Sequence, residues 1–194
     1  MIELPLPFKR SQPTFPYNRG LAKSRTAATF DTMQRKHPEM FKSSLEKFSK
    51  NFDIEHPRFV PVPKEHLINT QNQAYWIPLF SVQQKGKARL VFAAVAKTNN
   101  ICLNDTLLQG PDRNNTLTGV LLRFRRHPKA VTADIANMFH QIAVPDHHRT
   151  NMRFFWYKDN DPKKELIEYW SNVHLQGLRS SPKLSPRHIL ASTK

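Results

Sequence analysis

The sequence predicts an α+β fold in which helices pack against an antiparallel sheet. Apolar residues recur at helical spacing in the first third of the chain, whereas short apolar runs separated by turn residues dominate from residue 75 onward. The 194 residues are 39% hydrophobic and 10% aromatic, which is enough to build a core and excludes a wholly disordered chain. At this length we expect one domain, or one with a partial second.

The first third of the chain predicts a leader and two helices. Residues 1 to 16 contain four prolines and predict an extended leader. A helix is expected from Asn18, a suitable N-cap, to about Lys36, and a better patterned helix starts at Pro38. The second helix has an apolar face that predicts packing into the core and a charged face opposite. The apolar face comprises Met40, Phe41, Leu45, Phe48 and Phe52, and the charged face Lys42, Glu46, Lys47 and Lys50.

A basic hairpin is expected after a connection that spans residues 57 to 73. Residues 75 to 82 predict a strand in which Pro78 forces an edge or a bulge. Residues 84 to 87 predict a turn, and residues 88 to 95 predict a second, apolar strand. The turn carries two lysines, so the tip of the hairpin is basic.

The remainder of the chain predicts a helix followed by strands. A polar stretch from residue 97 to 115 precedes a helix expected over 116 to 126, which a His-Pro pair ends. A strand over 129 to 135 would deliver Asp134 at its end, where a carboxylate either pairs with an arginine or lysine or holds a divalent cation. Further elements are strands over 152 to 157 and 166 to 170, with a turn at 159 to 162 between them.

The chain is strongly basic, with 30 Lys and Arg against 15 Asp and Glu and a formal net charge of +15. Such a charge favours a polyanionic partner, with nucleic acid first and an anionic membrane surface second. The longest apolar run, from Leu90 to Ala96, is far shorter than the ~20 residues that span a bilayer, so no membrane span is expected. The N-terminus lacks the apolar core of a secretory signal, and Cys102 has no second cysteine to pair with. An intracellular location, in the cytoplasm or nucleus, is therefore favoured.

Other constellations indicate no particular chemistry. His140, His147 and His148 lie near Asp146, but their spacing matches no zinc pattern, so surface histidines are expected. The sequence has no glycine-rich phosphate loop and no nucleophile elbow.

A series of short motifs occurs in an order that is typical of one family. The motifs are Tyr75-Trp76-Ile77-Pro78, Ala88-Arg89-Leu90-Val91-Phe92, Leu103-Asn104-Asp105 with Leu107-Leu108-Gln109-Gly110-Pro111, Gly119-Val120-Leu121-Leu122-Arg123-Phe124-Arg125, Ala133-Asp134-Ile135-Ala136-Asn137-Met138-Phe139, Met152-Arg153-Phe154-Phe155-Trp156, and Gln176-Gly177 with Ser181-Pro182. Together they resemble the polymerase region of reverse transcriptases, most closely those of Bel/Pao-type long-terminal-repeat retrotransposons. The resemblance runs from about Pro5 to Pro182.

The resemblance implies a division of the chain. Residues 17 to 115 would form a fingers-like region with the basic hairpin, and residues 116 to 182 a partial palm with antiparallel sheet and packed helices. The segment from 183 to 194 is a divergent tail. Members of the family are RNA-directed DNA polymerases, which use Mg²⁺ to transfer a deoxynucleotide from its triphosphate to a DNA primer on an RNA template.

The resemblance also assigns site residues. It implies that Asp134 and the carbonyl of Ile135 hold Mg²⁺, and that Phe139 is a steric gate against a 2′-hydroxyl. It further implies that Arg89 holds the incoming triphosphate. The segment that lines the nucleotide pocket would contain Gln176 and Gly177.

The sequence departs from the family's pattern in its metal ligands. Two-metal chemistry needs carboxylates from separate segments; the family supplies the others from a Tyr-x-Asp-Asp turn, whereas this sequence has no Asp-Asp pair. Ala93 stands where the family usually has an aspartate. The motifs do not place the lysine that accompanies the fingers arginine, and Lys85 and Lys87 are candidates by proximity only. We therefore expect a truncated reverse transcriptase domain that is catalytically incompetent. Two alternatives stay open: a non-catalytic basic module that binds RNA or DNA, and a fragment that does not fold alone.

Overall fold

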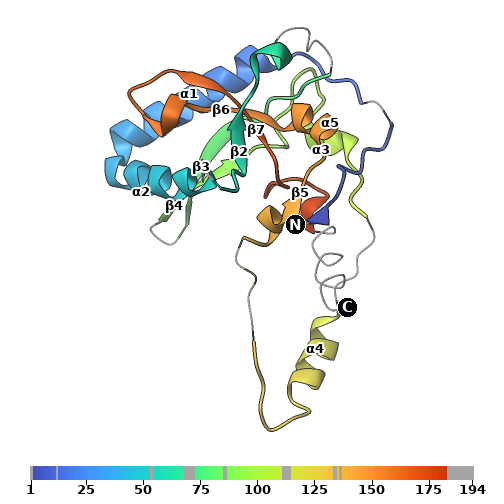
Figure 1. Cartoon of the computed structure of the whole chain (residues 1–194). Coiled ribbons are helices and arrows are strands. Elements are labelled where there is room, and N and C mark those ends of the chain that lie inside the picture. The colour runs from blue at the N-terminus through green and yellow to red at the C-terminus, as the bar shows by residue number, and fades with distance from the viewer. Residues whose placement is uncertain are drawn as a thin grey trace.

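The computed structural model describes residues 2–11, 13–52, 55–67, 73–84, 87–110, 115–132, 135 and 137–182. Two long helices lie side by side against the strands of the body, and a shorter helix projects away from it (Figure 1). The helices are α1 (Arg19–Lys36), α2 (Pro38–Ser49), α3 (Leu103–Thr106), α4 (Leu117–Phe124) and α5 (Asp146–Arg149), and the 3₁₀ turns are η1 (Lys50–Phe52), η2 (Lys64–His66), η3 (Met138–Gln141), η4 (Thr150–Met152) and η5 (Lys158–Asn160). The strands are β1 (Ile2–Glu3), β2 (Phe59–Pro61), β3 (Leu79–Gln84), β4 (Lys87–Phe92), β5 (Ile142–Ala143), β6 (Arg153–Tyr157) and β7 (Leu166–Ser171). This architecture confirms the expected α+β class.

The strands form three small sheets. β2, β7 and β6 make an antiparallel sheet in that order, with Val60 and Arg153 on either side of Trp170. β3 and β4 form the expected antiparallel hairpin, in which Leu79 faces Phe92 and Val82 faces Arg89. β1 runs parallel to β5.

The helix α1 is more regular than its sequence pattern suggests. The side chains it buries are Ala22, Thr26, Phe30 and Met33. These residues lie on one face at helical spacing, but one is small and another polar, which weakens the hydrophobic pattern. Asn18 precedes the helix without capping it, because its side chain binds the main chain of Trp76 instead: Nδ2 donates to the Trp76 carbonyl at 2.7 Å and Oδ1 accepts from the Trp76 amide at 3.1 Å.

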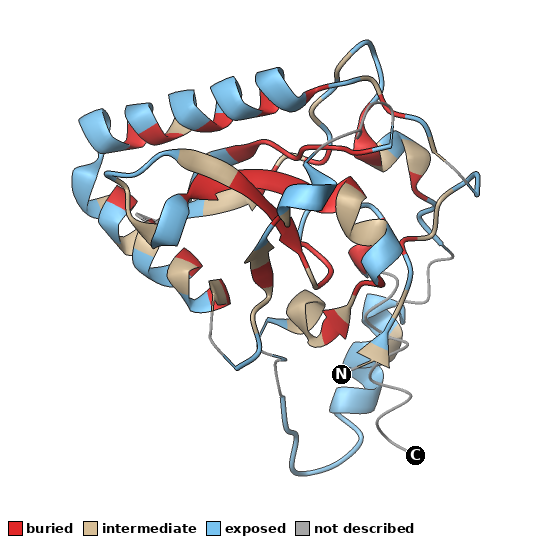
Figure 2. Cartoon of the chain, turned by 45° about the horizontal axis from the view of Figure 1, so that its top comes forward, coloured by how far each residue is buried: buried red, intermediate tan, exposed pale blue. Residues whose placement is uncertain are grey.

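An aromatic cluster forms the core between α2 and the sheets. The Phe48 ring of α2 lies 4.1 Å from Trp156 of β6, 5.3 Å from Phe59 of β2 and 6.0 Å from Phe92 of β4. Phe48 therefore packs against residues of three strands that lie far apart in the sequence. Figure 2 shows the result: buried residues on the strands and on the inner sides of the helices, and exposed residues on the outer sides of the helices.

A buried polar network stabilises the other end of the three-stranded sheet. The carboxylate of Glu168 on β7 accepts from Arg19 at 2.6 Å, from the indole of Trp76 at 2.8 Å and from Arg153 at 3.3 Å. Arg153 is 0% exposed and its guanidinium also donates to the His66 carbonyl and to the Thr150 hydroxyl. A buried cation of this kind needs such partners to offset its lost hydration.

The N-terminal segment is extended and packs into the body. β1 lies against β5, and the side chain of Leu6 is buried. Two histidines bind its main chain: Nδ1 of His148 accepts from the Leu6 amide, and Nε2 of His174 lies 2.9 Å from the Leu4 carbonyl. Burial lowers the pKa of both histidines, so both are mainly neutral at pH 7 and able to make these contacts.

The expected elements differ from the structure in several places. The strand expected over 75 to 82 is divided at Pro78: Trp76 makes an isolated parallel bridge to Arg153, and β3 begins at Leu79. Proline has no N–H to continue a ladder. The connection from 57 to 73 contains the strand β2. The strand expected over 129 to 135 is absent from its described part, where Val131 is 89% exposed, because no described strand lies beside it to pair its backbone groups.

The helix α4 forms where expected but packs none of its residues into the core. Thr116 caps it by accepting from the Gly119 amide. The helix projects from the body (Figure 1) and buries none of its residues. The part of the chain that the structure describes includes no helix long and apolar enough to span a membrane.

Candidate functional site

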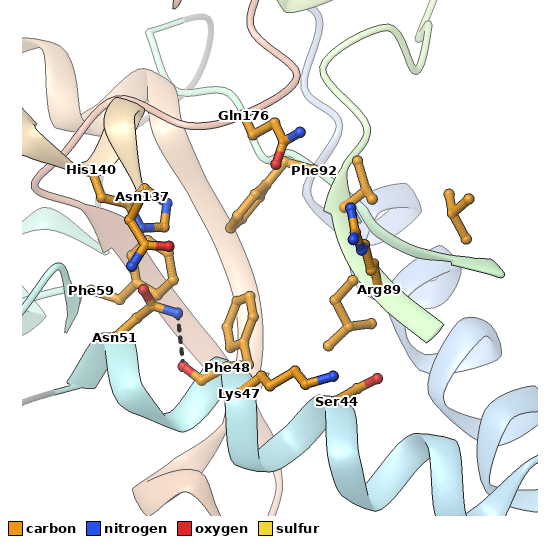
Figure 3. Close-up of a pocket in the computed structure, with 13 residues that line it drawn as sticks. Ser44, Lys47, Phe48, Asn51, Phe59, Arg89, Phe92, Asn137, His140 and Gln176 are labelled. Carbon is orange, nitrogen blue, oxygen red and sulfur yellow. Dashed lines mark hydrogen bonds between the residues drawn. The ribbon is translucent and has the colours of Figure 1, made fainter. Parts of the chain in front are cut away.

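A cavity of about 600 Å³ lies between α2, the β3–β4 hairpin, η3 and the loop after β7 (Figure 3). Its volume is typical of small-molecule sites, which occupy roughly 300–1,000 Å³. Four segments that are distant in sequence supply its walls.

The α2 wall is unexpectedly polar. Ser44, Lys47 and Asn51 line the cavity together with Phe48. These positions are three and four residues apart, so they share one side of the helix and the turn that continues it. The amide of Asn51 donates to the Phe48 carbonyl at 2.9 Å and its Oδ1 accepts from Arg58 at 3.4 Å, which fixes the Asn51 side chain.

The β4 wall presents Arg89. The Arg89 side chain is exposed and lines the cavity from β4, whereas Lys47 lines it from α2 (Figure 3). Neither cation has an ion pair or a hydrogen bond with another residue that the structure describes. No aspartate or glutamate is among the described residues of the lining. The cavity is therefore cationic.

The η3 wall contributes Asn137 and His140. Asn137 adopts a left-handed conformation with φ of 51°, which lets the chain turn sharply into η3. Burial, with a smaller effect of the Arg58 charge, lowers the pKa of His140 to about 4, so the imidazole is neutral at pH 7. Its Nδ1 is buried and has no hydrogen-bond partner among the described residues.

The fourth wall is the loop that carries Gln176. Gly177 has φ of 108° and its Cα approaches the main chain of β4. The Asn104 side chain bridges the loop, since it donates to the Gly177 carbonyl at 2.9 Å and accepts from the Arg179 amide at 2.8 Å. Leu175 and Leu178 are buried on either side. The loop is thus anchored at several points and presents Gln176 to the cavity.

The structure brings together two of the site residues that the sequence indicates. Arg89 and Gln176 line the same cavity, and Gly177 supports it from behind. Phe139 is half-buried on η3 and is not part of the lining, and the side chain of Ile135 is 42% exposed. Asp134 lies outside the described residues, as do Lys85 and the side chain of Lys87.

Several polar residues of the lining were not predicted from the sequence. The amphipathic pattern of α2 placed Lys47 on the charged face, opposite the residues that pack into the core. His140 was expected at the surface, and this expectation is wrong because its ring packs 6.1 Å from Phe59. Asn51 was not singled out. A signal did exist for the helix residues, because Ser44, Lys47 and Asn51 repeat at helical spacing beside Phe48.

The described residues alone do not form a metal site. No group of three or more His, Cys, Asp or Glu side chains lies close enough together, among the residues with described positions, to hold a metal ion. Asp134, the expected partner of the Ile135 carbonyl in holding Mg²⁺, lies outside the described part.

No protein-family model and no curated protein matches the sequence. Among solved structures, the chain is similar to a foamy viral protease–reverse transcriptase solved in complex with double-stranded DNA, with a TM-score of 0.55 and 14% sequence identity. The similarity covers 98% of this chain and 27% of the viral one. The protein therefore has a reverse-transcriptase-like fold and spans about a quarter of the length of that polymerase chain.

Proposed function

We propose that the cavity binds the triphosphate of a deoxynucleotide and that the chain forms the fingers and part of the palm of a reverse transcriptase. The observation that carries this proposal is the meeting of Arg89 and Gln176 in one cavity. Both residues belong to sequence motifs that imply a nucleotide site, and these motifs lie far apart in the chain.

The chemistry of the cavity supports a polyphosphate ligand. The Arg89 guanidinium can form paired hydrogen bonds with phosphate oxygens, which are charge-assisted and therefore strong. Gln176 and Asn137 can donate or accept hydrogen bonds with a sugar or a base. The rings of Phe48 and Phe92 add apolar surface beside these groups.

The finer assignments extend the same proposal. The motifs favour the Bel/Pao group, with residues 17 to 115 as fingers and 116 to 182 as partial palm. Phe139 is proposed as the steric gate. Members of the fold family use a divalent metal, and Asp134 with the Ile135 carbonyl is the proposed pair of Mg²⁺ ligands. Transfer of the deoxynucleotide to a primer would need further carboxylates, because two-metal chemistry takes its ligands from separate segments.

Nucleic acid is the second proposed ligand. The net charge is +15, and a similar viral protein was solved with double-stranded DNA. Arg123, Arg125 and Arg126 are exposed at the end of the projecting helix α4. This exposed basic group equally favours the rival function, a non-catalytic module that binds RNA or DNA through its phosphates.

Equilibrium binding of dTTP tests the proposal. Arg89→Gln should lower the affinity for dTTP about tenfold or more, because a charge-assisted contact is lost. Gln176→Ala should lower it by a smaller factor. Arg35→Gln is the matched control, since Arg35 is exposed on α1 and is not part of the lining. Equal affinities for wild type and Arg89→Gln would overturn the nucleotide site and leave the nucleic-acid module as the better function.

A further inference from the structure

Ser44 and Lys47 of α2 and Asn51 of η1 form a polar stripe beside the apolar face of the helix. Ser44 and Asn51 are only 4% and 8% exposed. Helix positions that face a core are normally apolar, because a buried polar group loses its hydration. Here the three residues line the cavity. The Asn51 amide is bound to Phe48 and Arg58, so Lys47 is the member of the group whose charge is available to a ligand.

The position of Lys47 is fixed by its neighbour. Phe48 is buried between Trp156 and Phe92, with ring centroids at 4.1 Å and 6.0 Å. The α2 main chain at Lys47 is therefore held against β4 and β6. Figure 3 shows the Lys47 side chain extended along α2, while Arg89 extends from β4 on another wall of the same cavity.

The charges at the mouth of the cavity are uncompensated. The structure pairs several other cations with carboxylates, including Arg19, Arg149, Arg153 and Lys164. Lys47 and Arg89 have no such partner among the described residues, and the described lining has no acidic side chain. Two cations that line one cavity repel each other, and an anion bound between them would turn this repulsion into two attractions.

We infer that Lys47 is the second cation of the phosphate-binding site, so that the triphosphate is held between helix α2 and the hairpin. This inference rests on the proposed function and goes beyond it, since motif comparison points to a hairpin lysine for this role. The planar guanidinium of Arg89 can donate two parallel hydrogen bonds, and the ammonium of Lys47 provides a compact positive charge from the α2 wall. Such a pair of cations would bind the β- and γ-phosphates, because these groups carry most of the negative charge of the triphosphate.

The first experiment measures the binding of inorganic tripolyphosphate, dTTP and dTMP. Lys47→Gln should weaken tripolyphosphate and dTTP about tenfold, because one charge-assisted contact is lost, and should change dTMP binding much less. Lys47→Arg should retain most of the affinity. Lys42→Gln is the matched control, because Lys42 is exposed on the same helix and outside the lining. A purely structural role would weaken all three ligands together.

The second experiment uses the unmodified protein. Lysines are acetylated with an amine-specific reagent, with and without tripolyphosphate, and the modified positions are identified by mass spectrometry. Tripolyphosphate should protect Lys47 several-fold and leave Lys42 unchanged. This measurement does not depend on whether a variant folds.

The outcomes separate the two proposals. Wild-type affinity in Lys47→Gln, together with weak binding by Arg89→Gln and no protection of Lys47, overturns the role of Lys47 and leaves the nucleotide site intact. Absence of tripolyphosphate binding by wild type, or full binding by Arg89→Gln, overturns the proposed function itself. Loss in both variants, with protection of Lys47, supports both.

Discussion

The Cα of Gly177 lies so close to β4 that a Cβ at this position would be 2.6 Å from the carbonyl oxygen of Phe92. The backbone of Gly177 also has a positive φ. A side chain is therefore excluded twice, by the backbone conformation and by main-chain atoms that cannot rotate away. This contact fixes the loop that presents Gln176 to the wall that carries Arg89.

Gly177→Ala should reduce the free energy of unfolding by about 2 kcal/mol, because the loop must shift or strain. Affinity for dTTP should fall as well, since Gln176 moves with the loop. Chemical denaturation and ligand titration measure the two effects. Gly20→Ala is the control: a Cβ added to Gly20 on α1 would meet nothing within 4 Å, and alanine is the better helix former, so this variant should be neutral or slightly stabilised. Equal stabilities for the two variants would contradict the packing described.

Arg153→Met should destabilise the protein by about 3 kcal/mol, because it removes a buried cation from the Glu168 network. Arg19 and Trp76 would still bind the carboxylate, which limits the loss. Urea denaturation measures the change. Lys164→Gln breaks the exposed pair with Asp159 and should leave the free energy of unfolding nearly unchanged. A similar small effect for Arg153→Met would show that the buried pair contributes little.

Stability should decrease between pH 6.5 and pH 4 through His140. Its pKa in the folded protein is about 4, below the ordinary 6.5, so the unfolded chain binds more protons within this window. The stabilisation is complete above pH 6.5 and is lost as the pH falls; between pH 7 and pH 5 the loss from this residue is about 2 kcal/mol. Burial shifts the pKa of His148 and His174 in the same direction.

Denaturation curves at several pH values compare wild type with His140→Gln, which cannot titrate in this range. The variant should retain only the part of the pH dependence that comes from the other histidines. An unchanged slope would mean that His140 is accessible to protons in the folded state.

Affinity for single-stranded DNA or RNA should fall steeply with salt. If about six phosphates of a single strand are neutralised, the loss of affinity between 50 and 200 mM salt is about three hundredfold. Replacement of Arg123, Arg125 and Arg126 by Gln should lower both the affinity and the slope of its logarithm against the logarithm of salt concentration. The control replaces Arg25, Arg35 and Lys36, which are exposed on α1. Fluorescence anisotropy measures both quantities, and a flat salt dependence would exclude phosphate contacts.

Local patterns predicted much of the fold. Pro38 and the apolar stripe after it located α2, and the turn at Asp159 located the β6–β7 connection, where Asp159 and Asn160 have positive φ. The hairpin followed from two apolar runs around a basic turn. Each of these signals lies within a short stretch of sequence.

Features that depend on distant partners were not predictable in the same way. β2 is a strand because β7 pairs with it, and its three residues carry no pattern of their own. Residues 129 to 132 have a strand-like sequence but no described neighbour. Lys47 lines the cavity because Phe48 fixes the helix against β4, a contact that helix periodicity alone cannot specify. The order of the motifs indicated Arg89 and Gln176. The α2 residues of the cavity belong to none of these motifs, so only the three-dimensional structure places them at the site.

The docking of the N-terminal segment constrains the order in which parts of the protein can fold during synthesis. Leu6 meets His148 and Leu4 meets His174 across separations of 142 and 170 positions. On the ribosome these early residues emerge long before their partners exist, so their docking is complete only after His174 has been made. Contacts of such high contact order form slowly, and the apolar side chain of Leu6 is exposed to chaperones and to aggregation until then.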